Sequence, residues 1–354
     1  MQQFYIESVK PGMTLGKTIY DDRNNELLKS GTVLSENIIK RLKDKGFYTL
    51  CIDTLESKGI VLDDNIPITV RHQAVTAIKN LDIPSVIDSA KEIVSCICDT
   101  LNISFDLLDN RNGDNFDYEH AIAVTEMAIA VGSELRDKNG ELMFNRSQLE
   151  ELAVASLLHD IGKRCSDRRV LEKLNASNSA KDTVLSYSEK LSPVYGYCLL
   201  KDNVQVPSVV KASVLFHRTD ENGKNMPIAI DKSRIHIFAR IIHVADFYDI
   251  LIHHKTDSGV YLSTSEAIEY LMASCGTKFN LDVVQAFIRH VPIYPKGTKV
   301  TLSNGLEGVV YENKVGEMLR PKILLKDGTI IDLMNNNSIT IVPDQKQVGG
   351  KSLC

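Results

Sequence analysis

The sequence predicts a mainly α-helical fold, in which a helical bundle is flanked by a small N-terminal α+β module and a small C-terminal β-rich module. Between residues 66 and 290, apolar side chains recur at the spacing of amphipathic helices. On either side, residues 1–60 and 292–342 show short apolar-polar alternations that are broken by turn residues. We therefore expect three modules, of which the middle one carries any chemistry.

The N-terminal module is expected to contain short strands and one helix. Ser35 is in place to cap the helix, which carries Ile38, Ile39 and Leu42 and ends at Gly46. The strands are predicted at residues 18–20, 27–28 and 48–52.

The middle module shows the helical period most clearly in two stretches, 86–101 and 149–157. At the start of the second, Ser147 is the expected N-cap, and Glu150, three residues on, completes a capping box. Gly-rich phosphate-binding loops of the Rossmann and Walker types are absent from the sequence, which argues against those nucleotide-binding folds.

The C-terminal module is predicted to consist of short strands that are joined by Gly and Asn turns. The expected strands are residues 299–302, 308–311, 322–325, 329–333 and 339–342. Residues 343–354 are expected to form a disordered tail.

The composition is that of a soluble globular protein with two or three domains. Of the 354 residues, 43% are hydrophobic and 25% are charged, and the formal net charge is −5. Non-specific nucleic-acid binding relies on Lys and Arg that neutralise phosphates, so this charge argues against a nucleic-acid partner. It is compatible with one small anionic ligand in a local pocket.

Three features predict a cytoplasmic location. The first twenty residues lack the apolar core of a signal peptide. The most apolar segment, 235–252, contains histidine, arginine and aspartate side chains, so we expect no membrane span there. The cysteines are scattered without a C-x-x-C pair, which indicates reduced thiols.

The strongest chemical signal is the segment LLHDIGK, residues 157–163. On a regular helix the neighbours His159 and Asp160 would point about 100° apart. At the last turn, before Gly162, they can approach one ion, and an imidazole beside a carboxylate suits Mn, Fe or Zn. Lys163 then lies within reach of an anionic substrate. By itself such a pair is more typical of a surface cap.

Three further residues change that interpretation. His120 lies among the apolar positions of DYEHAIAVTEMAIAVG, Asp246 lies within RIIHVADFYDIL, and His217 follows an apolar run. Each has a structural explanation of its own, as a hydrogen-bonded core histidine or a paired buried acid. Together with His159 and Asp160 they form a possible coordination set from separate helices.

Residues from about 115 to 290 resemble the HD-GYP domains, a branch of the HD phosphohydrolase superfamily. The resemblance rests on His120, on LLHDIGK, on RIIHVADFYDIL and on AIEYLMASCGTKFNLDVVQAF, and it covers roughly half of the chain. The flanking segments are similar to the modules that often precede and follow this domain. The resemblance implies an HD-type helical bundle.

The resemblance also implies an activity, which is the hydrolysis of cyclic di-GMP to pGpG or GMP at a centre of two or three divalent metal ions. It implies catalytic roles for Asp160 and Lys163, and substrate contacts for Lys163 and Lys173. The metal ligands that it implies are His120, His159, Asp160, His217 and Asp246.

The sequence departs from the family pattern in its signature segment. Where the family reads H-H-E-x-x-D-G-x-G-Y-P, residues 217–227 read HRTDENGKNMP. Arg218 and Thr219 replace two ligands, and Ser192 stands where the family has another histidine. The second metal site keeps only His217 and Asp160, next to a guanidinium charge that repels a cation. We therefore expect one metal ion at most, Fe or Mn, or none.

Three functions are compatible with this pattern. The first is a degenerate signalling protein that binds cyclic di-GMP or other signalling proteins with weak or no hydrolysis. The second is an active phosphodiesterase that uses one metal ion and the substrate-binding Arg218, because a guanidinium binds phosphate oxygens bidentately. The third is a single-metal phosphohydrolase that acts on another nucleotide.

Three other histidines complete the set of candidates. His243 lies one helical turn before Asp246 and is a candidate replacement ligand, although a core or surface histidine is the more typical explanation. His253 and His254 are interpreted as a solvated helix end.

Overall fold

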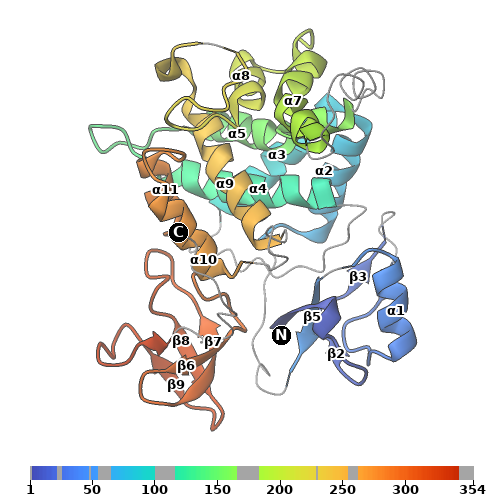
Figure 1. The fold of residues 1–354 in the computed structure, drawn as a ribbon, viewed down its shortest axis with the longest axis vertical. Helices are drawn as coiled ribbons and strands as arrows, with labels where there is room; N and C mark the ends of the chain where they lie inside the picture. Colours follow the sequence, from blue (N-terminus) through green and yellow to red (C-terminus); the bar gives the residue numbers. More distant parts are fainter. Residues whose placement is uncertain are drawn as a thin grey trace. The chain divides into compact units, whose positions relative to one another are not determined.

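The computed structural model describes residues 2–21, 26–47, 49–54, 65–99, 116–165, 183–228, 230–253 and 262–342. The chain divides into two compact units (Figure 1). One contains Asp64–Ile103 and Asp114–Val291 and is helical, and the other includes Met1–Asp63 and Pro292–Cys354 and holds the sheets. The predicted fold class, a helical bundle with small β-containing modules at the chain ends, is confirmed. The division into three modules stays a prediction.

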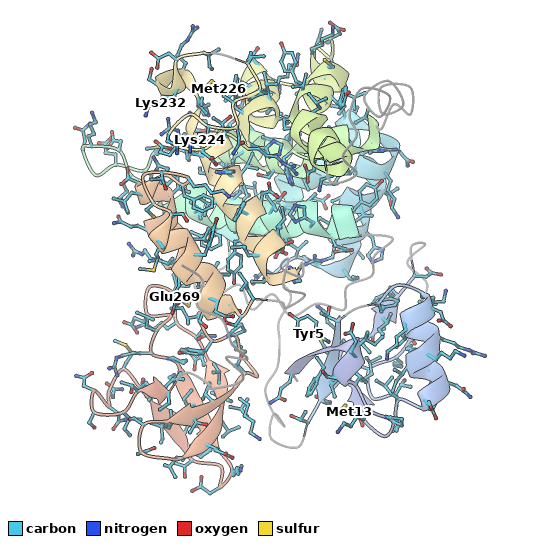
Figure 2. The ribbon with its side chains drawn as sticks, in the orientation of Figure 1. Tyr5, Met13, Lys224, Met226, Lys232 and Glu269 are labelled. Carbon is cyan, nitrogen blue, oxygen red and sulfur yellow. The ribbon has the colours of Figure 1, made fainter. Side chains whose placement is uncertain are left out.

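The N-terminal module has an antiparallel sheet with β5 at its centre, between β1 and β2, and β3 pairs separately with β4. Its strands are β1 (Gln2–Tyr5), β2 (Thr14–Leu15), β3 (Ile19–Tyr20), β4 (Glu26–Leu28) and β5 (Thr49–Asp53). Helix α1 (Glu36–Asp44) begins after Ser35, whose side chain accepts a hydrogen bond from the Ile38 N–H. The predicted helix and its cap are confirmed. Met13 packs against the core of this module (Figure 2).

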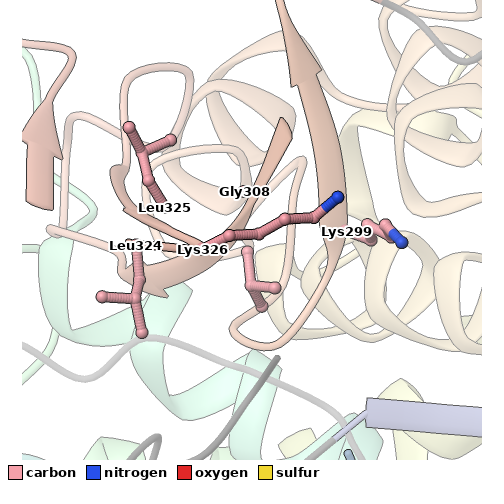
Figure 3. A pocket seen from close by; sticks show the side chains of 6 residues that line it. Lys299, Gly308, Leu324, Leu325 and Lys326 are labelled. Atoms are coloured by element: carbon pink, nitrogen blue, oxygen red, sulfur yellow. The ribbon is translucent and has the colours of Figure 1, made fainter. Parts of the chain in front are cut away.

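The C-terminal module is a single antiparallel sheet with the strand order β10-β6-β7-β8-β9. Its strands are β6 (Lys299–Leu302), β7 (Glu307–Glu312), β8 (Lys322–Leu325), β9 (Ile330–Asp332) and β10 (Ile341–Val342). All five predicted strands are present: β6 and β8 have the predicted ends, and the ends of the other three shift by one or two residues. A pocket of only about 20 Å³ lies on this sheet between Lys299, Gly308 and Lys326 (Figure 3), and it has room for about one water molecule.

The helical unit is built around α4. Its helices are α2 (Ile68–Asn80), α3 (Ile83–Cys98), α4 (Phe116–Glu134), α5 (Arg146–Leu158), α7 (Thr183–Leu200), α8 (Ser208–Phe216), α9 (Ile237–His253), α10 (Thr264–Ala273) and α11 (Leu281–Phe287), with the short 3-10 helices η4 (Ile161–Cys165) and η5 (Lys232–Arg234). Helix α4 packs against α2, α3, α5, α9 and α11, and every residue from 120 to 132 is buried. A helix segment that is buried on all sides belongs in a core, so the polar side chains between residues 120 and 132 of α4 lie inside the unit.

The start of α5 differs from the prediction. The N-cap is Asn145, whose side chain accepts a hydrogen bond from the Gln148 N–H, and the Gln148 side chain accepts one from the Asn145 N–H. The predicted capping box of Ser147 and Glu150 is therefore wrong by two residues. Asn caps a helix as well as Ser does, and Gln serves at the third position as Glu does.

Among the described residues, no helix is long and apolar enough to cross a membrane.

Candidate metal centre

Four side chains that can ligate a metal ion meet in the core of the helical unit. His120 comes from α4, His159 and Asp160 follow the end of α5, and Asp246 comes from α9. One ligand atom of each lies within 4.8 Å of those of the others, and all four residues are buried. Because α4 packs against both α5 and α9, segments that are far apart in the sequence converge here.

The adjacent pair owes its position to the end of α5. The helix ends at Leu158, and His159 and Asp160 lie in the turn before η4. His159 Nδ1 is 2.7 Å from the Ser156 carbonyl oxygen, so Nδ1–H donates to that oxygen and Nε2 faces the centre. Nε2 lies 3.4 Å from Asp160 Oδ2. Both side chains therefore point to the same place.

His120 is held between two aspartates of α9. Its Nδ1 lies 2.7 Å from Asp249 Oδ2, and its Nε2 lies 3.1 Å from Asp246 Oδ1. When Nδ1–H donates to Asp249, Nε2 remains for a cation, an arrangement common around metal-binding histidines. Sequence reasoning missed Asp249. The available signal was a second acid, one turn after Asp246, on a strongly apolar helix.

The charges of the centre stabilise one another. Burial opposes ionisation of Asp160 and Asp246, but neighbouring positive groups hold the pKa of each carboxyl well below its usual range. Burial also opposes protonation of His159, yet the negative charges of Asp160 and Asp246 raise its pKa to about 9. His159 Nε2 makes no hydrogen bond to any described residue. Two ionised carboxylates and two imidazoles fit a divalent transition metal ion.

Two cationic side chains flank Asp160. The Lys163 ammonium lies 2.5 Å from Asp160 Oδ2, and Arg218 Nη2 lies 2.9 Å from Asp160 Oδ1. Arg218 Nε–H donates to His217 Nε2 at 3.3 Å. His217 Nε2 is itself 3.7 Å from Asp160 Oδ1. The guanidinium therefore contacts both residues that a second metal ion would need.

A cavity of about 540 Å³ adjoins the centre and lies within the size range of ligand sites. Its apolar lining includes Leu215, Met226 and Phe247, and Figure 2 shows Met226 on the segment between α8 and α9. Its polar lining consists of Arg218, Asp220, Asn225, His243, Asp246 and Lys278.

The remaining sequence candidates are not members of the group of four among the described residues. Lys173 lies outside the described residues. Ser192 and Thr219, which stand at family ligand positions, are buried, and their hydroxyls make no hydrogen bond within the described part of the chain. His243 faces Asp220 across 3.3 Å, away from the group of four.

One histidine differs from expectation. His253 is not part of a solvated helix end: it is 6% exposed, and its Nδ1–H donates to the Asp249 carbonyl oxygen at 2.9 Å. Helix α9 is buried as far as its last turn, so its buried face extends further along the chain than the solvated helix end expected from the sequence. His254 lies outside the described residues.

Residues 117–251, which include all four ligands, match the HD domain family. This segment therefore carries an HD domain. Over 236 residues, 67% of the chain, it is 28% identical to the cyclic di-GMP phosphodiesterase PA4108 of Pseudomonas aeruginosa. The HD domain expected from the sequence is thereby confirmed.

The match spans 54% of the relative's length, about half. Among solved structures, Bd1817, an HDG"Y"P protein from Bdellovibrio bacteriovorus, is 18% identical with a TM-score of 0.47. That match covers 81% of this chain and 97% of the Bdellovibrio chain.

Proposed function

We propose that the HD domain is a degenerate signalling module that binds one divalent metal ion, Fe or Mn, and a cyclic dinucleotide of the cyclic di-GMP type, with weak or no hydrolysis. The ligand class follows from the relative in Pseudomonas aeruginosa. The observation that carries the proposal is the position of the Arg218 guanidinium, in contact with both His217 and Asp160.

The first metal ion is supported by the four buried ligands. Asp249 orients His120, and the Ser156 carbonyl orients His159, so each imidazole presents Nε2 to the centre. Imidazole and carboxylate ligands together suit Fe(II) and Mn(II). When bound, such an ion lowers the pKa of a water ligand and offsets phosphate charge.

Arg218 disfavours a second ion in two ways. It already uses the lone pair of His217 Nε2 and one oxygen of Asp160. Its charge also repels a cation: at 4 Å and an effective dielectric constant near 20, two unit charges repel by about 4 kcal/mol, and a divalent ion by about twice that. Hydrolysis that depends on two metal ions is therefore expected to be weak.

The cavity supports binding of a dianionic dinucleotide. Arg218 and Lys278 provide positive charge on its wall, while Leu215, Met226 and Phe247 provide apolar surface. A ligand that combines phosphates with flat bases matches this mixture.

A second function, a one-metal phosphodiesterase, is favoured by the exposure of Arg218. Its side chain is 23% exposed and lines the cavity, so the guanidinium can also contact a phosphate oxygen of a bound ligand. Lys163, with a side chain that is 26% exposed, provides another positive charge at Asp160.

Metal content and turnover test both functions. Protein purified anaerobically is loaded with Fe(II) or Mn(II), and the metal bound per chain is measured by mass spectrometry for wild type, Arg218→His and Arg218→Ala. We expect one ion in wild type, nearly two in Arg218→His, which restores a ligand, and one in the matched Ala variant. Two ions in wild type would contradict the role assigned to Arg218.

Turnover separates the two functions. Cyclic di-GMP is incubated with each metal form, and the products are followed by chromatography, with Asp160→Ala as the control. Binding without turnover supports the signalling module. Turnover that disappears in Asp160→Ala would instead establish the one-metal phosphodiesterase.

A further inference from the structure

The cavity contains a second pair of buried polar groups, outside the metal centre. Asp220, in the segment after α8, is 8% exposed, and His243 of α9 is 5% exposed. His243 Nε2 faces Asp220 Oδ1 at 3.3 Å. These two atoms and His243 Nδ1 make no hydrogen bond to any described residue. A buried polar atom without a partner is energetically costly, so three of them on two residues that line one cavity indicate contacts to a ligand.

The backbone around Asp220 is fixed. The N–H groups of Glu221 and Asn222 donate to the carbonyl oxygens of Lys278 and Thr277, at 3.0 and 2.9 Å. These bonds join the segment after α8 to the turn after α10. The carboxylate therefore has a defined place on the cavity wall.

Asn225 orients the carboxylate itself. Its Nδ2–H donates to Asp220 Oδ2 at 2.9 Å, which leaves Oδ1 directed at His243. Asn225 has a φ of 59°, in the left-handed region that a non-glycine residue rarely adopts. Such backbone strain is characteristic of functional sites. Asn meets both needs, because it tolerates this conformation and supplies the amide.

Lys278 adds a donor beside these groups. Its ammonium lies 3.4 Å from the centre of the Phe247 ring, and Phe247 stacks on Tyr270 at 5.6 Å and 13°. Lys278, Asp220 and His243 all line the same cavity. The wall thus combines an acceptor, two imidazole nitrogens and a cationic donor next to an aromatic ring.

We propose that Asp220 and His243, with Lys278, form a base-recognition subsite that selects guanine over adenine in the bound cyclic dinucleotide. The inference rests on the proposed function and specifies its ligand. One edge of guanine presents two neighbouring donors, N1–H and the N2 amino group, with the acceptor O6 beside them. A carboxylate only accepts, so it pairs with these donors, and an ammonium pairs with O6.

Adenine is disfavoured at such a subsite. Its N1 is an acceptor, and it would face a carboxylate that cannot donate. A site built to bind hydrogen-bonding groups discriminates strongly against an analogue that lacks them, because its own buried polar atoms stay unpaired.

A divalent cation between Asp220 and His243 is the competing occupant. The separation of 3.3 Å would suit two ligands of one ion. However, no third His, Cys, Asp or Glu of the described residues joins them in a ligand group. The ammonium of Lys278 also shares the cavity wall and opposes a cation.

Calorimetry with the manganese-loaded full chain tests the proposal. The probes are cyclic di-GMP, cyclic di-AMP and cyclic di-IMP. The base of cyclic di-IMP, hypoxanthine, differs from guanine only by lacking the N2 amino group. We expect wild type to bind cyclic di-GMP most tightly, cyclic di-IMP less tightly and cyclic di-AMP least, with affinities for the first and the last that differ by about tenfold or more. In Asp220→Asn and His243→Ala, affinity for cyclic di-GMP should fall about tenfold, while affinity for cyclic di-AMP should be unchanged. Asp231→Asn, at an exposed acid outside the cavity, is the matched control.

Each other outcome has a defined meaning. If wild type binds cyclic di-GMP but both variants keep its preference for guanine, the subsite is wrong and the proposed function stands. If wild type binds none of the three probes, the proposed function fails and the subsite with it. If either variant loses a metal ion relative to Asp231→Asn, the pair is a cation site, which overturns base recognition.

Discussion

Asp249 decides which nitrogen of His120 faces the metal centre. Its Oδ2 accepts the hydrogen bond from Nδ1–H at 2.7 Å, and the residue is fully buried. Changing such a partner typically weakens metal binding by about 10- to 100-fold. We expect Asp249→Asn, which removes the charge but keeps an acceptor, to weaken Mn(II) binding about tenfold, measured by competition with a chelator. Unchanged affinity would show that packing alone orients His120.

At the scale of single residues, sequence reasoning succeeded for polar side chains whose burial among apolar residues costs free energy. His120 and Asp246 are polar side chains on apolar helices, and both lie in the group of four possible ligands. Asp220 and His243 were not recognised as a pair, because one is in an irregular segment and the other on a helix. Their proximity depends on how that segment folds back, which no periodicity reports.

The cap of α5 gives a prediction at the scale of one element. Asn145 and Gln148 satisfy each other's backbone N–H groups, whereas Ser147 lies inside the first turn. We expect Asn145→Ala to lower the free energy of unfolding by about 1 kcal/mol, and Ser147→Ala to change it by only a few tenths. Urea denaturation of both variants measures the difference. A larger loss in Ser147→Ala would restore the cap predicted from the sequence.

The contact between η4 and α7 leaves no room for a side chain at Gly162. A Cβ there would lie 1.9 Å from the Ser192 carbonyl oxygen and 2.4 Å from the Gly196 nitrogen. Both are backbone atoms, so one element must move, and a shift of η4 moves the preceding turn with His159 and Asp160. We expect Gly162→Ala to lower the free energy of unfolding by about 3 kcal/mol and to weaken metal binding, measured by denaturation and metal titration.

Gly132 provides the control for this prediction. A Cβ at Gly132 would meet only the ends of the Leu152 and Leu149 side chains, at 2.8 and 2.9 Å. Flexible side chains can give way, and Ala favours a helix over Gly by about 1 kcal/mol. Gly132→Ala is therefore expected to cost much less and to leave metal binding intact. Equal losses in both variants would contradict the argument from the backbone contact.

Elements with a local signature were predictable, and those defined by distant partners were not. Helix α1 has its own cap and apolar face, and the strands of the C-terminal sheet are separated by clear turns. Strands β1 and β2 were missed, because β2 is two residues long and both exist only through pairing with β5. Pairing over long sequence separations leaves little pattern in a short strand.

For the whole molecule, stability is coupled to protons and metal through the helical unit. Without metal, the pKa of His159 is about 9, against an ordinary value of 6.5. A pKa raised by folding stabilises the protein fully below pH 6.5, and this contribution, about 3 kcal/mol, is lost as the pH passes 9. The lowered pKa values of Asp160 and Asp246 act oppositely, since their contribution is lost on acidification.

A bound metal ion counteracts the loss of stability at alkaline pH. It binds deprotonated imidazole, so below pH 9 it must displace the His159 proton, and its net stabilisation grows as the pH rises. We therefore expect the Tm of chelator-treated protein to fall between pH 6.5 and 8.5, and the Tm gain from Mn(II) to widen. Differential scanning fluorimetry of wild type and His159→Gln measures both. The variant should show a smaller alkaline decline in the chelator-treated form, because it keeps only one of the two imidazoles with a raised pKa, that of His120. A Tm gain that stays constant with pH would show that His159 is not a metal ligand.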